Sequence, residues 1–283
     1  MVQLSPEVRA YLRAAREGSG KLVFLTGAGI SAESGIPTFR GEEGYWRVGS
    51  KNYHPQELAT RAAFMRMPEE VWRWYLYRRT VCRAAAPNPG HLALVQLERA
   101  FGDRFVLVTQ NVDGLHLRAG NSLPRTLQIH GNIDFMRYPV PEGPHAIPIP
   151  DGADGGPAVG SYGRDTPLSQ ADRALLVGPG GEPARPHVLW FDEYYDEPRF
   201  RADSALRAAS QADVLVVVGT AGATNLPMQI AALAARAEVP LIDVNLDPDN
   251  PFARHATADG PGASIVGSAT EVLPALAAAL SDR

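Results

Sequence analysis

Three side chains that follow predicted strands could carry acid–base chemistry. Asn111 and Asp113 follow the apolar run Phe105–Val108, and His130 follows Thr126–Ile129. An amide and a carboxylate two residues apart share one face of an extended chain, and a histidine can take a proton near neutral pH. Ligand groups in open α/β sheets gather at strand ends, so we expect these side chains to face one crevice. A structural turn histidine and an Asx turn are the plainer alternatives.

A glycine-rich stretch earlier in the chain predicts a dinucleotide site. The apolar run Leu22–Leu25 favours a buried parallel strand, and the next residues have the form Gly-x-Gly-x-x-Ala: Gly27, Ala28, Gly29, Ile30, Ser31 and Ala32. The first glycine suits a tight turn, the second suits close approach of a pyrophosphate, and the amides of the next helix could bind phosphate. Proline and glycine then interrupt that helix, so we expect a flap formed by Thr38, Phe39 and Arg40. A glycine turn without a ligand is the alternative.

Two later strands end in residues suited to the adenosine half of a dinucleotide. The predicted strand Val214–Val218 ends in Gly219, Thr220 and Ala221, and Leu241–Val244 ends in Asn245, Leu246 and Asp247. A carboxylate at such a strand end can bind a ribose hydroxyl, and ordinary strand termination is the alternative.

The elements that position these residues alternate between strand and helix. A last strand is expected at Ser264–Val266, and helices are expected at about 5–17, 69–85, 91–101, 199–212 and 228–237. This order predicts an α/β fold with a doubly wound, Rossmann-like parallel sheet. Residues 1–42, 88–136 and 187–283 are assigned to that domain. Residues 43–87 and 137–186 are assigned to a smaller inserted lobe, helical in its first part and loop-rich, with many prolines and glycines, in its second.

Composition excludes several classes of protein. The 283 residues carry a net charge of -4, with 45% hydrophobic and 20% charged residues, as expected for a soluble globular protein rather than a nucleic-acid or membrane binder. The N-terminal stretch has no apolar signal core, so we expect a cytoplasmic location. The single cysteine excludes an internal disulfide, and His54, His91 and His116 have no metal-ligand spacing with a cysteine partner.

The motifs together resemble those of the sirtuins, the NAD-dependent protein deacylases. The run GAGISAESGIPTFRG at 27–41 is similar to their signature, and TQNVDGLH, IHGN, RPHVLWFDE, VVVGT and VNLDP follow in the family's order. The resemblance implies NAD as cofactor, acyl-lysine proteins or peptides as substrates, and His130 as the base for a ribose hydroxyl. It also implies that Asn111 and Asp113 hold the nicotinamide carboxamide and the ribose, with Gln110 on the ribose. Ala221 stands where the family usually has serine, and Ala269 stands where it often has cysteine. The backbone of Ala269 could still contact the adenine.

A second resemblance concerns the acyl group. Tyr75 and Arg78 lie three apart on a predicted helix and could grip a carboxylate, as in the sirtuins that remove succinyl, malonyl and glutaryl groups; Ala59 matches a small residue there. A core tyrosine and a surface arginine are the alternative. The segment 185–193 resembles the one that pairs with the substrate peptide, which makes Val188 and Phe191 substrate contacts.

The chain departs from the family at the zinc site. Sirtuins usually hold a zinc ion with two Cys-x-x-Cys pairs, whereas Tyr138 stands where the first of these cysteines is expected and only one cysteine is present. We therefore expect no zinc. Two other readings stay open: ADP-ribosyl transfer or NAD hydrolysis in the same pocket, and a non-catalytic NAD-sensing module.

Overall fold

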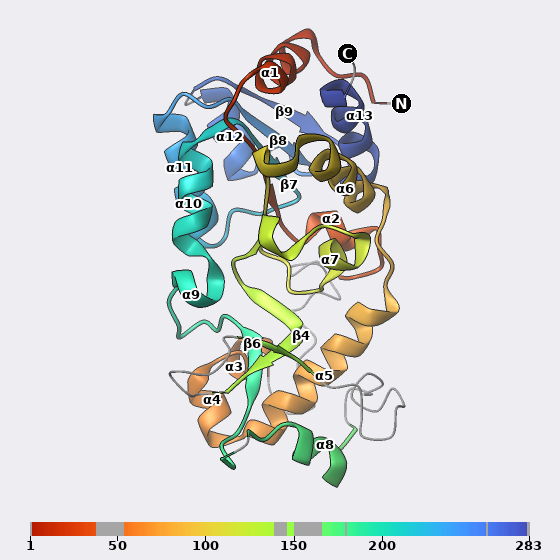
Figure 1. The fold of residues 1–283 in the computed structure, drawn as a ribbon, viewed down its shortest axis with the longest axis vertical. Helices are drawn as coiled ribbons and strands as arrows, with labels where there is room; N and C mark the ends of the chain where they lie inside the picture. Colours follow the sequence, from red (N-terminus) through yellow and green to blue (C-terminus); the bar gives the residue numbers. More distant parts are fainter. Residues whose placement is uncertain are drawn as a thin grey trace.

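The larger of two sheets is parallel and has six strands in the order β3-β2-β1-β7-β8-β9. The computed structural model describes residues 2–37, 54–138, 146–149, 166–178, 180–258 and 260–281. The sheet occupies the upper half of Figure 1, and its strands are β1 (Lys21–Thr26), β2 (Phe105–Thr109), β3 (Thr126–Gln128), β7 (Ala212–Val218), β8 (Leu241–Asn245) and β9 (Gly262–Val266). The chain runs outward from β1 to β3 and then returns to place β7 beside β1. The strand order therefore reverses at β1 and β7, where open sheets bind ligands.

Helices cover both faces of this sheet. Leu22 and Phe24 of β1 pack into one hydrophobic cluster, whereas Val23 and Leu25 pack into the other. The alternation explains why the strands are continuous apolar runs. One face is covered by α1 (Pro6–Glu17), α6 (Pro89–Phe101) and α13 (Ala269–Ser281), and the other by α10 (Ala202–Ser210), α11 (Asn225–Arg236) and α12 (Pro251–Ala258) (Figure 1). The predicted doubly wound sheet is confirmed.

Three helices differ by two or more residues from their predicted bounds, and one of them, α11, begins at Asn225 rather than at Met228. Helix α6 begins at Pro89 rather than at His91 because Asn88 accepts hydrogen bonds from the amides of Gly90 and His91, and proline suits a first turn. The helix expected at 199–212 is two pieces, α9 (Glu197–Phe200) and α10, because Arg201 has a φ of 54°. Short elements complete this part: α2 (Gly29–Ala32), α7 (Leu115–Ala119) and the 3-10 turns Gly102–Arg104 and Leu123–Arg125.

The smaller sheet is antiparallel and lies in the lower half of Figure 1. Its order is β5 (Ile147–Pro148), β4 (Gly131–Arg137) and β6 (Arg185–Val188), and it is accompanied by α3 (Pro55–Leu58), α4 (Arg61–Arg66), α5 (Pro68–Ala84) and α8 (Gln170–Leu175). The segment expected to be loop-rich thus contributes a helix and two strands. The assigned domain boundaries stay a prediction.

A buried arginine joins the pieces of this lobe. The Arg79 side chain is 0% exposed; its Nε donates to Asp134 at 2.9 Å and its Nη2 donates to the carbonyl of Ile149 at 3.3 Å. On the same helix, the indole of Trp72 donates to the carbonyl of Ala184 at 2.7 Å. Helix α5 therefore anchors three segments that are far apart in the sequence.

Two buried histidines lie side by side beneath the glycine-rich turn. The rings of His91 and His116 have centroids 4.9 Å apart. Nδ1 of His91 accepts from the Asn88 amide at 3.3 Å, and Nε2 of His116 lies 3.0 Å from the hydroxyl of Thr26. Burial lowers the pKa of His91 to about 4 and the pKa of His116 well below its usual value.

Replacing His91 by glutamine is expected to flatten the pH dependence of stability. The fold favours the neutral ring, so as pH falls from about 6.5 the unfolded chain binds the proton first, and unfolding becomes easier until about pH 4. This difference in pKa corresponds to a loss of roughly 3 kcal/mol. Glutamine keeps an acceptor at this capping-box position but does not titrate. Urea unfolding of both proteins from pH 7.5 to 4.5 measures the effect, and parallel profiles would contradict it.

Candidate active site

The carboxyl ends of the central strands open into one large cavity. It measures about 1030 Å³, at the upper limit of ordinary small-molecule pockets, and is lined from both sheets and from α3 and α5. The predicted site residues on its wall are Gly27, Ala28, Gly29, Ala32, Ala59, Tyr75, Gln110, Asn111, His130, Val188, Phe191, Gly219, Thr220, Ala221, Asn245, Leu246, Asp247 and Ala269. Residues from widely separated motifs therefore meet in a single cavity.

A few predicted residues lie elsewhere. Asp113 lines a smaller adjoining cavity. The side chain of Ile30 is in the core beneath the sheet, so only its backbone could meet a cofactor. Arg78 is 4% exposed, with its guanidinium carbon 6.0 Å from the centre of the Trp74 ring. Thr38, Phe39 and Arg40 lie outside the described residues.

Several residues on the cavity wall had not been predicted. Thr224 and Ser268 follow strands β7 and β9, so the rule that ligands gather at strand ends could have found them. Trp190 and Glu193 belong to the 185–193 block, from which only Val188 and Phe191 had been assigned a role, and Tyr195 follows that block without a motif to mark it.

The glycine-rich turn packs directly against the turn after β7. A Cβ atom on Gly29 would lie 2.6 Å from Cα of Gly219, and one on Gly27 would lie 2.6 Å from Cβ of Thr220. The Gly29 amide donates to the Gly219 carbonyl at 2.8 Å, whereas the amides of Ile30 and Ser31 donate to carbonyls within the glycine-rich turn itself. The glycines thus permit close contact of two turns, and phosphate binding by these amides stays a prediction.

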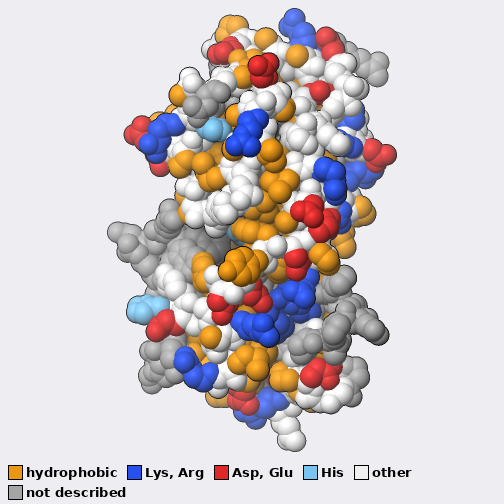
Figure 2. All heavy atoms as spheres, turned by 90° about the vertical axis from the view of Figure 1, so that its left-hand side faces the viewer, with side chains coloured by type: hydrophobic (Ala, Val, Ile, Leu, Met, Phe, Trp, Pro, Cys, Tyr) orange, Lys and Arg blue, Asp and Glu red, His pale blue; other side chains and the backbone are white. Residues whose placement is uncertain are grey.

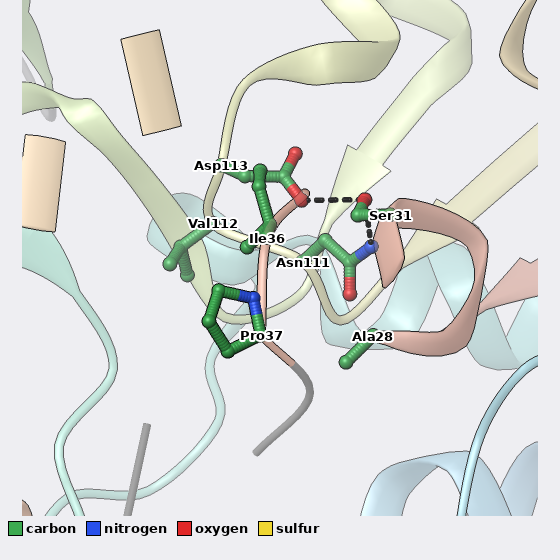
Figure 3. Close-up of a pocket in the computed structure, with 7 residues that line it drawn as sticks. All are labelled: Ala28, Ser31, Ile36, Pro37, Asn111, Val112 and Asp113. Atoms are coloured by element: carbon green, nitrogen blue, oxygen red, sulfur yellow. Dashed lines mark hydrogen bonds between the residues drawn. The ribbon is translucent and has the colours of Figure 1, made fainter. Parts of the chain in front are cut away.

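Asn111, Asp113 and Ser31 form a buried polar group at the edge of the cavity. Ser31 donates to the Asp113 carboxylate at 2.7 Å, and the Asn111 amide nitrogen donates to Ser31 at 3.2 Å and to the Gly27 carbonyl at 3.0 Å (Figure 3). The amide oxygen of Asn111 points between Ala28 and Pro37 (Figure 3). An acceptor is therefore presented to the small cavity. Burial raises the pKa of Asp113 above its usual value.

His130 is held in one orientation by its Nδ1 atom. Nδ1 lies 2.9 Å from the backbone carbonyl of Gln110, and Nε2 lies 2.8 Å from the hydroxyl of Tyr195. Burial lowers the pKa of His130 to about 4, so the ring is neutral at pH 7. A carbonyl oxygen can only accept, so the ring hydrogen is on Nδ1 and Nε2 is the acceptor facing the cavity.

The opposite wall combines aromatic rings with a tyrosine hydroxyl. The Trp190 indole donates to the Tyr75 hydroxyl oxygen at 2.9 Å, which leaves the Tyr75 hydrogen to donate elsewhere. The Arg185 guanidinium stacks 3.4 Å from the centre of the Trp190 ring and forms a two-fold ion pair with Glu193. These contacts fix the aromatic wall.

The segment after β6 is tied to both lobes through its backbone. The amide of Leu189 donates to the His130 carbonyl at 2.9 Å, and the amide of Phe191 donates to the Ala59 carbonyl at 3.1 Å. The Asp192 carboxylate accepts from the amides of Arg61 and Ala62 and so caps α4. Asp192 is therefore engaged within the fold.

Known proteins resemble the chain across most of its length. A model of the Sir2 family matches residues 27–142. The NAD-dependent protein deacylase of Leptospira interrogans is 37% identical over 272 residues, covering 95% of this chain and 96% of that protein. The mitochondrial NAD-dependent protein deacylase sirtuin-5 of Canis lupus familiaris is 37% identical over 235 residues, which cover 80% of this chain and 73% of that protein.

Solved structures agree. A Sir2 homologue in complex with ADP-ribose has a TM-score of 0.75 and 32% identity, covering 96% of this chain and 95% of that one. A Sir2 homologue in complex with NAD has a TM-score of 0.74 and 32% identity, and the match covers 96% of this chain and 93% of that one. The similarity in sequence and in structure extends well beyond the glycine-rich signature, and the chain belongs to the Sir2 family.

Proposed function

We propose that the protein is an NAD-dependent protein-lysine deacylase with a preference for acidic acyl groups. The observation that carries this proposal is the neutral His130 ring, which presents an acceptor nitrogen to a cavity large enough for a dinucleotide and a substrate. Two relatives named NAD-dependent protein deacylase support it.

The residues present fit NAD. The cavity wall includes the glycine-rich turn, Asn111 and the ends of β7 and β8, so it offers an amide side chain together with the polar side chains of Thr220 and Asn245. When bound, NAD would supply an anomeric carbon that can accept the acyl oxygen of a modified lysine as nicotinamide leaves. Asn111 would accept from the nicotinamide carboxamide, and Asp247 would bind a ribose hydroxyl.

The side chain of His130 would then accept one proton. Nε2 of His130 would accept this proton from a ribose hydroxyl. Nδ1 would keep its own hydrogen and its hydrogen bond to the Gln110 carbonyl. A half-buried ring with a pKa of about 4 is neutral at pH 7, so its Nε2 lone pair can accept. With the consumption of one water, the products would be free lysine, nicotinamide and O-acyl-ADP-ribose.

The acyl preference rests on the wall formed by α5. Tyr75 lies on that wall with its hydrogen available to a ligand, and Arg78 is one turn further along the same helix. A phenol and a guanidinium are suited to a carboxylate. Ala59 adds little bulk, and the backbone around Val188 and Phe191 would meet the substrate peptide.

We also propose that the small lobe holds no zinc. The chain has one cysteine, and within the described ranges no three His, Cys, Asp or Glu side chains are grouped to hold a metal ion. Arg79 and Trp72 join the lobe instead. Elemental analysis of the purified protein is expected to find no stoichiometric zinc, and dialysis against a chelator should leave its melting temperature unchanged. One zinc per chain would contradict the proposal.

A side-by-side assay tests the function. Acetyl-, malonyl- and succinyl-lysine peptides are incubated with NAD, and nicotinamide and free lysine peptide are both measured. Equal release of the two products supports the deacylase. ADP-ribose or modified protein without loss of acyl-lysine would indicate the ADP-ribosyl or hydrolase reading, and calorimetric NAD binding without turnover would indicate an NAD-sensing module.

The surface charges and the lengths of the helices bear on partners and location. On the face drawn in Figure 2, acidic and basic side chains are interspersed. Along the described part of the chain, no helix is both long and apolar enough to cross a membrane. A cytoplasmic location and the lack of a nucleic-acid partner stay predictions of the sequence.

A further inference from the structure

The nitrogen that would act as the base is already in contact with a phenol. The hydroxyl of Tyr195 lies 2.8 Å from Nε2 of His130, and the two rings are stacked with centroids 5.8 Å apart at 30°. Tyr195 lies 65 residues further along the chain, between β6 and α9. Its ring packs against the hydrophobic cluster between the sheet and α10 and α11, so the hydroxyl is delivered by a fixed ring.

The direction of this hydrogen bond follows from the other side of the imidazole. Nδ1 must donate to the Gln110 carbonyl, so Nε2 has only a lone pair and Tyr195 must be the donor. Burial raises the pKa of Tyr195 to about 12, with the hydroxyl of Thr224 acting in the opposite sense. The phenol therefore keeps its hydrogen at neutral pH.

The same wall holds Gln110 in place. The Thr224 hydroxyl donates to Oε1 of Gln110 at 3.1 Å, and Nε2 of Gln110 donates to the Thr220 hydroxyl at 2.9 Å. The residue whose carbonyl orients His130 is thus itself fixed by two side chains.

Among the described residues, the carboxylates on the cavity wall are Glu33, Glu193 and Asp247, and Glu193 is paired with Arg185.

We propose that Tyr195 is a positioning residue that caps Nε2 of His130 in the free protein and yields this nitrogen to a ribose hydroxyl. The proposal deepens the proposed function and rests on it. In the free state the phenol donates to Nε2 and holds the ring plane. In the complex Nε2 of His130 would accept a hydrogen bond, and then a proton, from a ribose hydroxyl in place of the phenol. Tyr195 keeps its own proton throughout, so it is not the base.

The Tyr195→Phe variant keeps the ring that packs against the core and removes the hydroxyl, which caps His130 and also bonds to Thr224. A donor to the neutral imidazole favours the neutral form, so its loss is expected to raise the pKa of His130 in the free protein by about one pH unit. The matched control is Tyr194→Phe, whose 92% exposed ring is next in sequence. Nitrogen-15 NMR of the imidazole in wild type and both variants measures the titration without requiring activity.

Kinetics provide the second readout. The acidic limb of kcat/KM, which reports the free protein, should move to higher pH in Tyr195→Phe, whereas the acidic limb of kcat should stay in place because the ribose has displaced the phenol. An unchanged His130 titration, or an equal shift in Tyr194→Phe, would overturn the capping role, and so would a kcat limb that moves as far as the kcat/KM limb. If the wild-type protein released no nicotinamide from NAD with any acyl-peptide, the proposed function would be overturned. The NMR titration of His130 would still test whether Tyr195 caps Nε2.

Discussion

Replacing His130 by alanine is expected to lower kcat for deacylation by about 100- to 10,000-fold, the usual range for a positioned general base. The ring is the group that presents an acceptor nitrogen to the cavity from a fixed plane, with Nδ1 held by the Gln110 carbonyl. The removal leaves the glycine-rich turn and Asn111 untouched, so NAD should still bind. Single-turnover release of free lysine peptide measures the loss, and calorimetry measures retained NAD binding.

The control for this variant is His54→Ala. His54 is exposed, at the start of α3, and an imidazole lost there should leave turnover unchanged. Circular dichroism of both variants checks the fold. Full turnover by His130→Ala would exclude this residue as the base.

Replacing Arg78 by methionine is expected to lower kcat/KM for succinyl-lysine by about 10- to 100-fold more than for acetyl-lysine. A hydrogen bond to a charged group is worth roughly 1.5–3 kcal/mol, and only the succinyl substrate carries the carboxylate that would use it. Methionine keeps much of the apolar stem, so packing beside Trp74 is retained. The ratio of the two kcat/KM values is the measurement, because a general loss of folded protein cancels in it.

Arg83→Met is the matched control. Arg83 is on the same helix, and its Nε donates to Asp134 at 2.8 Å rather than lying beside Trp74. The control should leave the succinyl-to-acetyl ratio unchanged. Equal losses on both substrates for Arg78→Met would remove its proposed role in acyl recognition.

The sheet and its strand ends could be predicted because each depends on a local signal. Val214–Val218 is apolar at every position, which suits a strand buried on both faces, and the structure places it in contact with both clusters. The rule that ligands gather at the ends of such strands then brought Thr220, Asn245 and His130 to the same cavity. This part of the prediction needed only the order of the strands along the chain and the positions of the residues that follow them.

Other features depend on contacts between distant segments. The Tyr195–His130 hydrogen bond spans 65 residues, and the acid-rich run around Tyr195 has the composition of a solvated loop. Helix α8 and strand β6 lie in a segment rich in proline and glycine, where the carbonyl of Ala184 bonds to Trp72. Arg201 adopts a left-handed backbone without glycine or asparagine, so no residue type marked the break between α9 and α10.

The Arg79 anchor has a consequence for how this protein would respond to chemical stress. Its contacts are a guanidinium, a carboxylate and a backbone carbonyl, and the one cysteine, Cys82, is buried on the same helix. None of these anchoring groups is oxidised by peroxide, whereas metal-bound thiolates can be. If the lobe holds no zinc, as proposed above, it would keep its shape during oxidative bursts or metal starvation.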